Sequence, residues 1–263
     1  MIYRKDGYYD KIKKMTKSNF EIVMDFDGTI TDDNSLETWE TINGRSILPK
    51  EYDFERNFLY NYYHPIELDN ELDEVVKMGA MEDWLNEHLN LFKKYQLNTK
   101  QILDLYSDKK IMIFRKNFLD FFKYVDDNNI KLNILSAGIG DFILKFLEMN
   151  ECSFVNIDIR SNFFNFDRFG NVIGFKGSLI HALNKHDFAF EKGDKECVLL
   201  LGDRLSDIMM IEGYKKENIL SVAFVCRDDM DELESYKDVY DMVLSSDEGF
   251  IHILNDLKDV IDK

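Results

Sequence analysis

Two aspartates separated by one residue follow an apolar stretch near the start of the chain. Residues 20–24 are mostly apolar, which is typical of a buried strand, and Asp25, Asp27 and Gly28 come directly after them. Two carboxylates at the end of a core strand are costly to bury unless a cation or a cation-bound phosphate lies between them. Both can face one ligand if the chain turns there, which Gly28 permits. We therefore expect a cation and an anionic ligand at this position; the simpler alternative is a solvated turn.

Polar side chains also follow two later apolar stretches. Ser136 comes after one predicted strand, and Asp203 and Asp207 come after another. Because parallel strands end at a common sheet edge, where ligands bind in open α/β sheets, these side chains should lie near the two aspartates. A lysine between the two strands, either Lys176 or Lys185, can reach the same place. This set predicts phosphoryl transfer assisted by Mg²⁺, since an anionic substrate needs its charge neutralised.

Each residue has an expected role in such a reaction. Asp25 would be the nucleophile and would form an aspartyl-phosphate intermediate. Asp27 would protonate the leaving alkoxide and then deprotonate the attacking water, the two halves of general acid–base catalysis. Ser136, with the backbone N–H groups of Ala137 and Gly138, would bind the phosphate oxygens.

Oxygen ligands for Mg²⁺ are available from the same residues. In proteins Mg²⁺ binds a few hard oxygen ligands and keeps several of its waters. The expected ligands are the carboxylates of Asp25 and Asp203 and the backbone carbonyl of Asp27. Asp207 would orient a metal-bound water or the lysine, and it completes the predicted metal site.

An alternation of helical and strand patterns surrounds these residues. It indicates an α/β fold with a Rossmann-like parallel sheet covered by helices on both faces. Residues 1–19 are expected to form an outer helix. The expected strands are 20–24, 132–135, 154–159, 197–201, 220–225 and 239–244, the expected helices are 111–124, 141–149 and 250–261, residues 136–140 are expected to form a turn, and residues 164–175 a hairpin.

Residues 36–107 have a helical pattern without a strong strand signal. Both prolines of the chain, Pro49 and Pro65, lie in this segment and are expected to separate its helices. Since the segment follows the first strand of the sheet, it would form a helical cap over the carboxyl edge. We therefore predict a catalytic core of residues 1–35 and 108–263, with the cap inserted at residues 36–107.

The composition limits the partners and the location of the protein. A net charge of −17 would repel nucleic acid and anionic membranes, so we expect neither as a partner. The first residues lack the apolar core of a signal peptide and no stretch is long enough to span a bilayer, which favours a cytoplasmic protein. Cys152, Cys197 and Cys226 are widely spaced and are expected to be reduced. We expect a monomer.

Four motifs resemble those of the haloacid dehalogenase superfamily of aspartate-nucleophile phosphatases. They are Asp25-Phe26-Asp27-Gly28-Thr29, Leu135-Ser136-Ala137-Gly138, a lysine, and Leu201-Gly202-Asp203 followed by Asp207. More narrowly, the chain from about residue 20 to its end resembles the cytosolic pyrimidine 5′-nucleotidase family. This narrower resemblance rests on Tyr62-Tyr63-His64-Pro65-Ile66-Glu67, Gly174-Phe175-Lys176-Gly177, Asn184-Lys185-His186-Asp187 and residues 134–141.

That family implies Mg²⁺-dependent hydrolysis of nucleoside 5′-monophosphates, chiefly CMP and UMP, with 7-methyl-GMP as a substrate of some members. The family's catalytic lysine falls on Lys185, although the Lys-Gly pair at Lys176 resembles the lysine of phosphoserine phosphatases. Its base-binding glutamate falls on Glu67, and Trp84 and His88 on the following helix would lie beside the base. A small-molecule nucleoside monophosphate is thus the expected partner.

Several features leave the substrate open. Gly28 and Thr31 stand where animal members of the family usually have methionine and serine, and residues 204–206 replace a Ser-x-Gly triplet. A small-metabolite phosphatase resembling phosphoserine phosphatase is an alternative, and a phosphorylated signalling receiver is a third. Trp84 could also be a core residue of the cap, and His88 a buried polar residue with its hydrogen bonds made.

Overall fold

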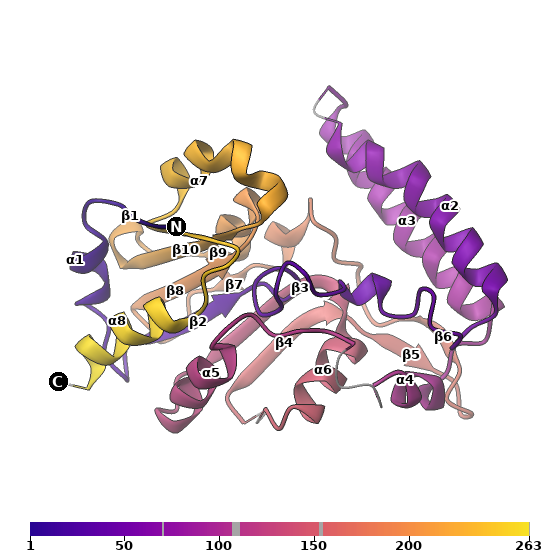
Figure 1. Cartoon of the computed structure of the whole chain (residues 1–263), viewed down its shortest axis with the longest axis horizontal. Coiled ribbons are helices and arrows are strands. Elements are labelled where there is room, and N and C mark those ends of the chain that lie inside the picture. The colour runs from indigo at the N-terminus through magenta and orange to yellow at the C-terminus, as the bar shows by residue number, and fades with distance from the viewer. Residues whose placement is uncertain (70, 107–110, 153–154, 263) are drawn as a thin grey trace.

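The computed structural model describes residues 1–69, 71–106, 111–152 and 155–262. Its centre is a seven-stranded sheet with the order β1-β11-β10-β8-β2-β3-β4 (Figure 1). Neighbouring strands are parallel except β1 and β11, which are antiparallel. The strands are β1 (Ile2–Arg4), β2 (Phe20–Met24), β3 (Leu132–Ile139), β4 (Ile157–Asn162), β8 (Cys197–Gly202), β10 (Ile219–Val225) and β11 (Met242–Ser245).

Alternate residues of the central strand β2 pack on opposite faces of the sheet. Ile22 and Met24 belong to the larger apolar core, and Val23 belongs to a smaller one on the other face. Figure 1 shows α5, α6 and α8 on one face and α7 on the other, so the predicted α/β fold is confirmed. The larger core is covered by α1 (Tyr8–Ile12), α5 (Phe118–Asp127), α6 (Gly140–Met149) and α8 (Ile251–Ile261). The other face carries α7 (Leu233–Val239) and the strand pair β7 (Phe190–Glu191) and β9 (Ile211–Glu212). It also carries the 3₁₀ helices η2 (Lys185–Phe188) and η3 (Leu205–Met210). Two more 3₁₀ helices are η4 (Lys216–Asn218) and η5 (Arg227–Glu232).

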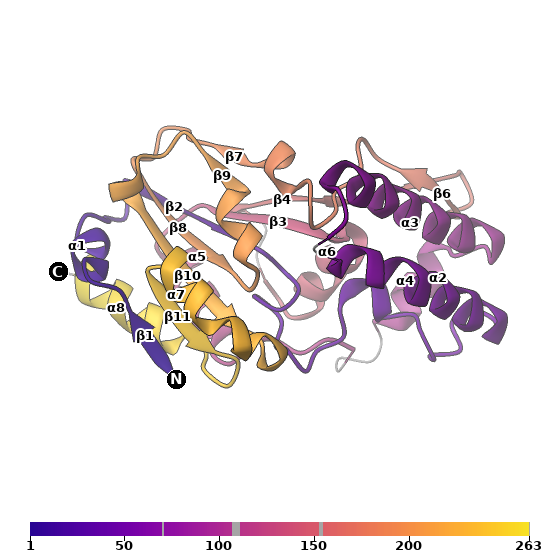
Figure 2. The same cartoon turned by 90° about the horizontal axis from the view of Figure 1, so that it is seen from above.

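A helical arm extends from one end of the sheet (Figure 1). The arm is formed by the helices α2 (Lys50–Leu68) and α3 (Glu74–Lys94), and α4 (Thr99–Leu105) lies beneath it in Figure 1. We call these three helices and the 3₁₀ helix η1 (Thr38–Glu40) the cap. Figure 2 shows α2 and α3 lying side by side. The local sequence starts two of these helices: the Asp73 carboxylate accepts the Val75 N–H at 2.9 Å, and Asn98 and Gln101 form a capping box. Among the described residues, no helix has both the length and the apolar character needed to cross a bilayer.

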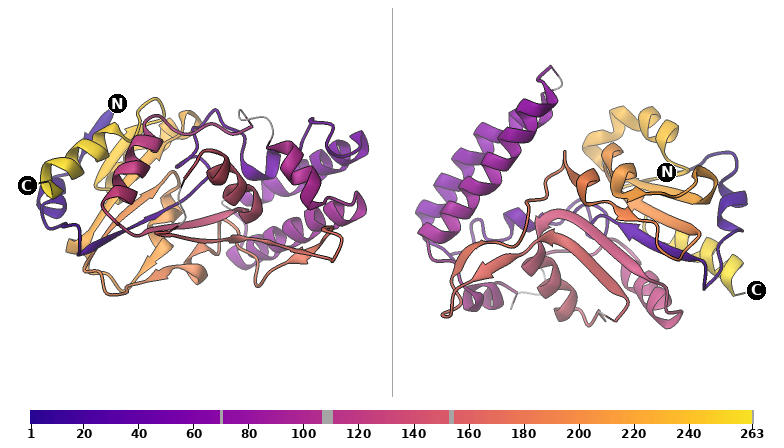
Figure 3. Two further views of the ribbon diagram at one scale, coloured as in Figure 1. Left: turned by 90° about the horizontal axis from the view of Figure 1, so that it is seen from below. Right: turned by 180° about the vertical axis from the view of Figure 1, so that it is seen from behind.

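A hairpin from later in the chain packs against the cap. Its strands are β5 (Phe164–Phe166) and β6 (Val172–Phe175), as predicted for residues 164–175. The Val172 N–H donates to the Leu97 carbonyl at 2.9 Å, and the rings of Phe92 and Phe164 lie 5.5 Å apart. The view from behind in Figure 3 shows the hairpin beneath the cap helices. The lobe over the sheet edge therefore contains two separate chain segments.

The two connections between core and cap run side by side. The Asp32 N–H donates to the Ile113 carbonyl at 2.8 Å, and Thr31 pairs with Phe114 in an isolated bridge. The Arg115 N–H donates to the Ile30 carbonyl at 2.9 Å. The chain thus leaves and re-enters the core at one place, which fits an insertion. The predicted boundary between residues 107 and 108 lies outside the described residues.

Two predictions near the third and fourth strands need correction. The helix predicted from residue 111 starts at Phe118, because Phe114 is held in an extended pairing with Thr31. The predicted turn at residues 136–140 belongs largely to β3, whose pairing with β4 becomes irregular between Leu135 and Ile139. The strand predicted at 154–159 is β4, which starts at residue 157, and residue 154 lies outside the described residues.

Two further predictions fail at the chain start and in the cap. Residues 1–19 form the edge strand β1 and the short helix α1, not one outer helix, because the extended backbone of residues 2–4 pairs with β11. Pro49 precedes α2, as predicted, but Pro65 does not end it: α2 continues to Leu68. A proline this close to a helix end interrupts few hydrogen bonds, so the helix can run past it.

Candidate active site

Three aspartates come together at the carboxyl ends of the neighbouring strands β2 and β8. Asp25 directly follows β2, Asp203 directly follows β8, and Asp207 lies in η3. One carboxylate oxygen of each lies within 4.8 Å of the other two, and all three side chains are buried. Gly28 has a φ of +74°, and a methyl group there would lie 2.5 Å from Asp203 Oδ2. The turn predicted at this glycine therefore also lets the backbone approach the cluster.

Lys185 lies among these carboxylates. Its Nζ is 2.9 Å from Asp25 Oδ1 and 2.8 Å from Asp207 Oδ1. Burial alone would lower the pKa of Lys185, but the charges of Asp207 and Asp25 outweigh burial and raise it above its usual value. Asp207 in turn accepts the backbone N–H groups of Asp203 and Arg204 on its other oxygen, at 3.1 and 3.0 Å. Asp207 is therefore fixed at both oxygens and holds the ammonium beside Asp25.

Negative charge exceeds positive charge in this cluster. Burial raises the pKa of Asp203 well above its usual range, and the charges of Asp207 and Asp25 raise it further. Burial likewise raises the pKa of Asp25, although Lys185 opposes the effect. Three carboxylates and one ammonium leave two excess negative charges, the charge that one divalent cation would balance. Clustered hard oxygen donors of this kind fit Mg²⁺.

Asp27 lies beside the cluster and is held by the first residue of the cap. Thr38 donates its backbone N–H to Asp27 Oδ1 at 3.2 Å and its hydroxyl to Asp27 Oδ2 at 3.0 Å. Burial raises the pKa of Asp27 well above its usual range, and the charges of Glu37 and Asp25 add to this, while the Thr38 hydrogen bonds oppose it. A carboxyl group with a raised pKa is suited to give and take a proton near neutral pH.

The irregular end of β3, residues 136–139, meets Asp27 at a glycine, and we call this segment the 136–139 loop. The Gly138 N–H donates to the Ser136 hydroxyl at 3.0 Å. A methyl group on Gly138 would overlap the Thr38 hydroxyl and would lie 3.0 Å from both Asp27 Oδ2 and Ser136 Oγ. The Ala137 carbonyl accepts the Trp39 indole N–H at 3.0 Å. The structure therefore brings Asp25, Asp27, the 136–139 loop, Lys185, Asp203 and Asp207 to one sheet edge.

Lys176, the other candidate for the catalytic lysine, lies elsewhere. It is exposed at the end of β6, with its Nζ 5.8 Å from the centre of the Phe163 ring. In the part of the chain that the structure describes, it forms no ion pair with the clustered aspartates. Lys185 is thus the lysine that meets the carboxylates.

A family model described as Pyrimidine 5′-nucleotidase (UMPH-1) matches residues 13–261. The chain belongs to this family. The 7-methylguanosine phosphate-specific 5′-nucleotidase of Homo sapiens is 30% identical over 250 residues, which are 90% of this chain and 83% of that protein. The Gallus gallus protein of the same description is 26% identical over 255 residues, covering 92% of this chain and 88% of its own. This chain is accordingly a 5′-nucleotidase, a phosphoric monoester hydrolase that acts on small nucleotides.

Solved structures show the same fold. Cytosolic 5′-nucleotidase IIIB bound to cytidine matches 99% of this chain and 93% of its own, with a TM-score of 0.86 and 22% identity. A phospho-aspartyl intermediate analogue of phosphoserine phosphatase matches 90% of this chain and 97% of its own, with a TM-score of 0.53 and 17% identity. The nucleotidase therefore has the haloacid dehalogenase-type α/β fold, as the sequence motifs indicated.

The three predicted base-binding residues of the nucleotidase lie in different surroundings. Glu67 is half-buried on α2, and its charge is one of several that add to burial in raising the pKa of Glu37. Trp84 is half-buried, stacked at 6.0 Å on Tyr63. His88 is 4% exposed and lies deeper in the cap. The roles of all three stay predictions.

His88 has its own partners inside the cap. Its Nε2 lies 2.9 Å from the Tyr52 hydroxyl, and its ring lies 5.0 Å from Trp39 and 4.8 Å from Phe92. Burial, together with the charge of Arg56, lowers the pKa of His88 to about 3, so the ring is neutral at physiological pH. Its hydrogen bond and its packing are consistent with the alternative of a buried polar residue.

Two residues of the nucleotidase site had no signal in the sequence. Thr38 binds Asp27, yet it stands in a segment without a motif. Arg115 is 1% exposed and donates to the carbonyls of Gly28, Thr29 and Ser246, so it holds the turn that follows the two aspartates. A lone arginine in an apolar, aromatic stretch is the feature that could have marked it.

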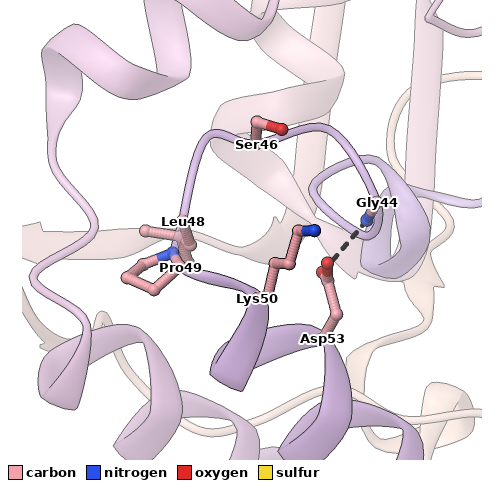
Figure 4. Close-up of a pocket in the computed structure, with 6 residues that line it drawn as sticks. All are labelled: Gly44, Ser46, Leu48, Pro49, Lys50 and Asp53. Carbon is pink, nitrogen blue, oxygen red and sulfur yellow. Dashed lines mark hydrogen bonds between the residues drawn. The ribbon is translucent and has the colours of Figure 1, made fainter.

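One cavity of the nucleotidase lies in the cap and does not contain the clustered carboxylates. It has a volume of about 580 Å³ and lies where the loop before α2 meets the start of that helix (Figure 4). There the Gly44 N–H donates to Asp53 Oδ1 at 3.0 Å. Its lining residues are Gly44, Ser46, Leu48, Pro49, Lys50 and Asp53. It contains none of the predicted site residues, so the candidate site rests on the clustered side chains.

Proposed function

We propose that this nucleotidase hydrolyses pyrimidine nucleoside 5′-monophosphates, CMP and UMP, and also 7-methyl-GMP, through an aspartyl-phosphate on Asp25 with Mg²⁺ as cofactor. The observation that carries the proposal is the position of Lys185 between Asp25 and Asp207 at the carboxyl edge of the sheet. A carboxylate attacks an anionic phosphoryl group only where positive charge offsets the repulsion, and a buried ammonium beside the attacking oxygen supplies part of that charge.

The residues around Asp25 fit Mg²⁺. Asp25 and Asp203 would bind the ion with their carboxylates and Asp27 with its backbone carbonyl, and Asp207 would act through Lys185 or a bound water. When bound, the ion would neutralise charge between the carboxylates and the phosphoryl group. The raised pKa values of Asp25 and Asp203 support this assignment, because burial and, after it, the neighbouring carboxylates make their charged forms costly without a cation.

The reaction proceeds in two displacements on phosphorus. Asp25 attacks the phosphorus of the substrate, the bond from phosphorus to the sugar 5′-oxygen breaks, and Asp27 donates a proton to that oxygen. Asp27, now ionised, takes a proton from water, the water oxygen attacks the phosphorus of the acyl phosphate, and inorganic phosphate leaves with Asp25 restored. The Ser136 hydroxyl and the Ala137 N–H hold the phosphoryl oxygens during both steps, and the Gly138 N–H holds the Ser136 hydroxyl in place.

The cap supplies the features expected of a base-binding site. Burial raises the pKa of Tyr60 on α2, and the charges of Glu37, Glu40 and Glu67 raise it further. Trp84 lies beside the aromatic rings of Tyr60 and Tyr63. Aromatic rings stack on a nucleobase, and a carboxylate accepts hydrogen bonds from its amino group. Clustered carboxylates would also favour the positive charge of a 7-methylated guanine. The printed names of the relatives, specific for 7-methylguanosine phosphate or bound to cytidine, support both choices.

The alternative substrate is a small phosphorylated carboxylate such as phosphoserine. It would need a free positive charge on the cap near Glu67. Two arginines act on the glutamates and tyrosines of this region. The guanidinium of Arg56 lies 3.6 Å from Glu40 and that of Arg204 lies 3.6 Å from Asp203. Because both arginines are paired with carboxylates of the protein, they are poor sites for the carboxylate of phosphoserine, which favours the nucleotide.

The test is phosphate release from CMP, UMP, 7-methyl-GMP, AMP, phosphoserine and p-nitrophenyl phosphate, with and without Mg²⁺. We expect Mg²⁺-dependent release, fastest from CMP, UMP or 7-methyl-GMP, and no turnover by the Asp25→Asn variant on any of them. Retained turnover in Asp25→Asn would exclude the covalent mechanism. Release from phosphoserine without release from nucleotides would keep the chemistry and overturn the substrate.

A further inference from the structure

One buried hydroxyl connects Asp27 to the loop proposed to bind phosphate. Thr38 is fully buried, and its hydroxyl accepts the Ile139 N–H at 3.1 Å. An amide can only donate, so the hydrogen of the hydroxyl remains free for Asp27 Oδ2, 3.0 Å away. The Thr38 backbone N–H donates to the other oxygen of the same carboxylate at 3.2 Å. Thr38 therefore binds Asp27 at both oxygens and the loop at a third point.

Thr38 supplies the side-chain and backbone donors that hold Asp27. Within the described ranges 1–69, 71–106, 111–152 and 155–262, both hydrogen bonds to the Asp27 carboxylate come from Thr38. Asp27 lies beyond the end of β2, next to the left-handed turn at Gly28, so no strand pairing fixes its side chain. Its direction therefore depends on residue 38.

The adjoining residue attaches the same short helix to the loop and to the cap. Trp39 donates its indole N–H to the Ala137 carbonyl at 3.0 Å. Its ring packs at 6.4 Å on Phe92 of α3 and at 6.1 Å on Phe175 of β6. The absent side chain of Gly138 allows the close approach, because a methyl group there would overlap Thr38 Oγ1. Helix η1 is thus rigidly placed between Asp27 and the loop.

We propose that Thr38 is a positioning residue that aims the Asp27 carboxyl group at the leaving oxygen of a phosphate bound by the 136–139 loop. The inference rests on the proposed function, in which Asp27 protonates the departing 5′-oxygen. One hydroxyl in contact with both groups fixes the distance between acid and phosphate, and proton transfer is sensitive to small errors in such a distance. Thr38 acts through Asp27 and takes no part in bond making.

Substrates with different leaving groups can distinguish a loss of Asp27 positioning from a general loss of protein stability. The 5′-alkoxide of CMP is a strong base and needs a proton as it departs, whereas p-nitrophenolate departs readily without one. The value of kcat/KM reports the steps up to departure of the leaving group, and not the later hydrolysis of the acyl phosphate that both substrates share. A misplaced Asp27 should therefore lower kcat/KM for CMP far more than for p-nitrophenyl phosphate.

The variants are Thr38→Val, which removes the hydroxyl at nearly constant shape, and Thr38→Ser, which keeps it. We expect T38V to lower kcat/KM for CMP, or for whichever nucleotide the wild type prefers, by about 10–100-fold and for p-nitrophenyl phosphate by less than about 3-fold. T38S should recover most of the nucleotide activity. Should T38V not fold, Thr38→Ala gives the same comparison.

The matched control is Thr41→Val. Thr41 is also fully buried, but its hydroxyl donates to the Thr38 carbonyl at 2.9 Å and not to Asp27, so the ratio of the two activities should stay at the wild-type value. Equal losses of T38V on both substrates, or none, would overturn the positioning role alone. A wild-type protein inactive on every nucleotide would instead overturn the proposed function together with this inference.

Discussion

The ammonium of Lys185 lies 2.9 Å from the carboxylate of Asp25, and both side chains are buried. The lysine is therefore already in place before any phosphate arrives, because Asp207 holds it from the other side at 2.8 Å. A preorganised charge of this kind stabilises a transition state without rearrangement of the site. Because Lys185 is paired with the aspartates, whereas Lys176 lies elsewhere, at the end of β6, substitution of each lysine should affect activity differently.

Lys185→Met should lower kcat/KM for CMP by about 10²–10³-fold or more, because the phosphoryl group then loses its buried positive neighbour. Lys176→Met is the control, since Lys176 is exposed and remote from the aspartates, and it should remain within about 3-fold of wild type. Steady-state kinetics on both purified variants make the comparison. The opposite ranking would assign the role to Lys176.

Removal of divalent cations should make stability depend on the aspartate cluster. Without a cation, the pKa values of Asp25 and Asp203 in the folded state lie above those in the unfolded chain. Their contribution to stability is thus fully present below the unfolded value near pH 4 and is lost as the pH rises through the folded values. We expect the thermal midpoint in EDTA to fall as the pH rises toward 8, and Mg²⁺ to restore it.

Asp203→Asn provides the matched measurement. The substitution removes one of the crowded charges, so in EDTA at pH 8 its midpoint should lie about 2–6 °C above that of the wild type, with little difference at pH 4. Added Mg²⁺ should stabilise D203N less than wild type, and phosphate release should be lost. If the thermal midpoint of D203N in EDTA at pH 8 were lower than that of wild type, the charge of Asp203 would not be destabilised by burial and by Asp25 and Asp207.

Gly138→Ala should impair activity because the new methyl group would clash with the Thr38 side chain. The added methyl group would overlap the Thr38 hydroxyl and press against Asp27 Oδ2, so η1 or the loop must shift. We expect a loss of at least about 10²-fold in kcat/KM, with a stability loss of about 1–3 kcal/mol. Gly174→Ala is the same substitution in open space and should be nearly silent. Denaturant unfolding and kinetics of both variants test this, and wild-type activity in G138A would contradict the close packing.

Glu67→Ala should change recognition of the base and leave the chemistry alone. In the proposed function Glu67 on α2 binds the base, so its loss should raise KM for CMP by about 10-fold or more, with little effect on p-nitrophenyl phosphate, which has no base. Glu71→Ala, at an exposed residue of the turn after α2, is the control. Equal effects of E67A on both substrates would remove Glu67 from base recognition.

The strand ends could be predicted because each combines two local signals. An apolar run marks β2 and β8, and an aspartate follows each directly, so Asp25 and Asp203 were placed at one edge from the sequence and the structure puts them there. Ser136 was expected just after a strand and lies within β3, where the pairing with β4 becomes irregular. That these residues share one edge follows from the rule that parallel strands expose their carboxyl ends together, whereas the order of the strands was not predicted. Lys185 needed the family motif, because nothing in its local pattern separates it from Lys176.

Residues that hold the site could not be predicted, because their partners are distant in the chain. Arg115 donates to Ser246, 131 residues away, and Thr38 accepts from Ile139, 101 residues away. Neither contact leaves a periodic pattern. The start of α5 was predicted too early for the same reason. The local sequence around Phe114 has a helical pattern, but Phe114 pairs in an extended conformation with Thr31, which is distant in the chain.

The paired connections at Asp32 and Ile113 give the cap the character of an exchangeable module. Both ends of the inserted segment leave the core at adjacent positions, so a different insert would have to match one short gap, the hairpin at residues 164–175 and the Thr38 contact with Asp27. Under the proposed function, we expect substitutions within α2 and α3 to alter which nucleotide is accepted while Asp25, Lys185 and Asp203 stay unchanged. The cap would then be the place to engineer a new specificity, provided that residue 38 is kept.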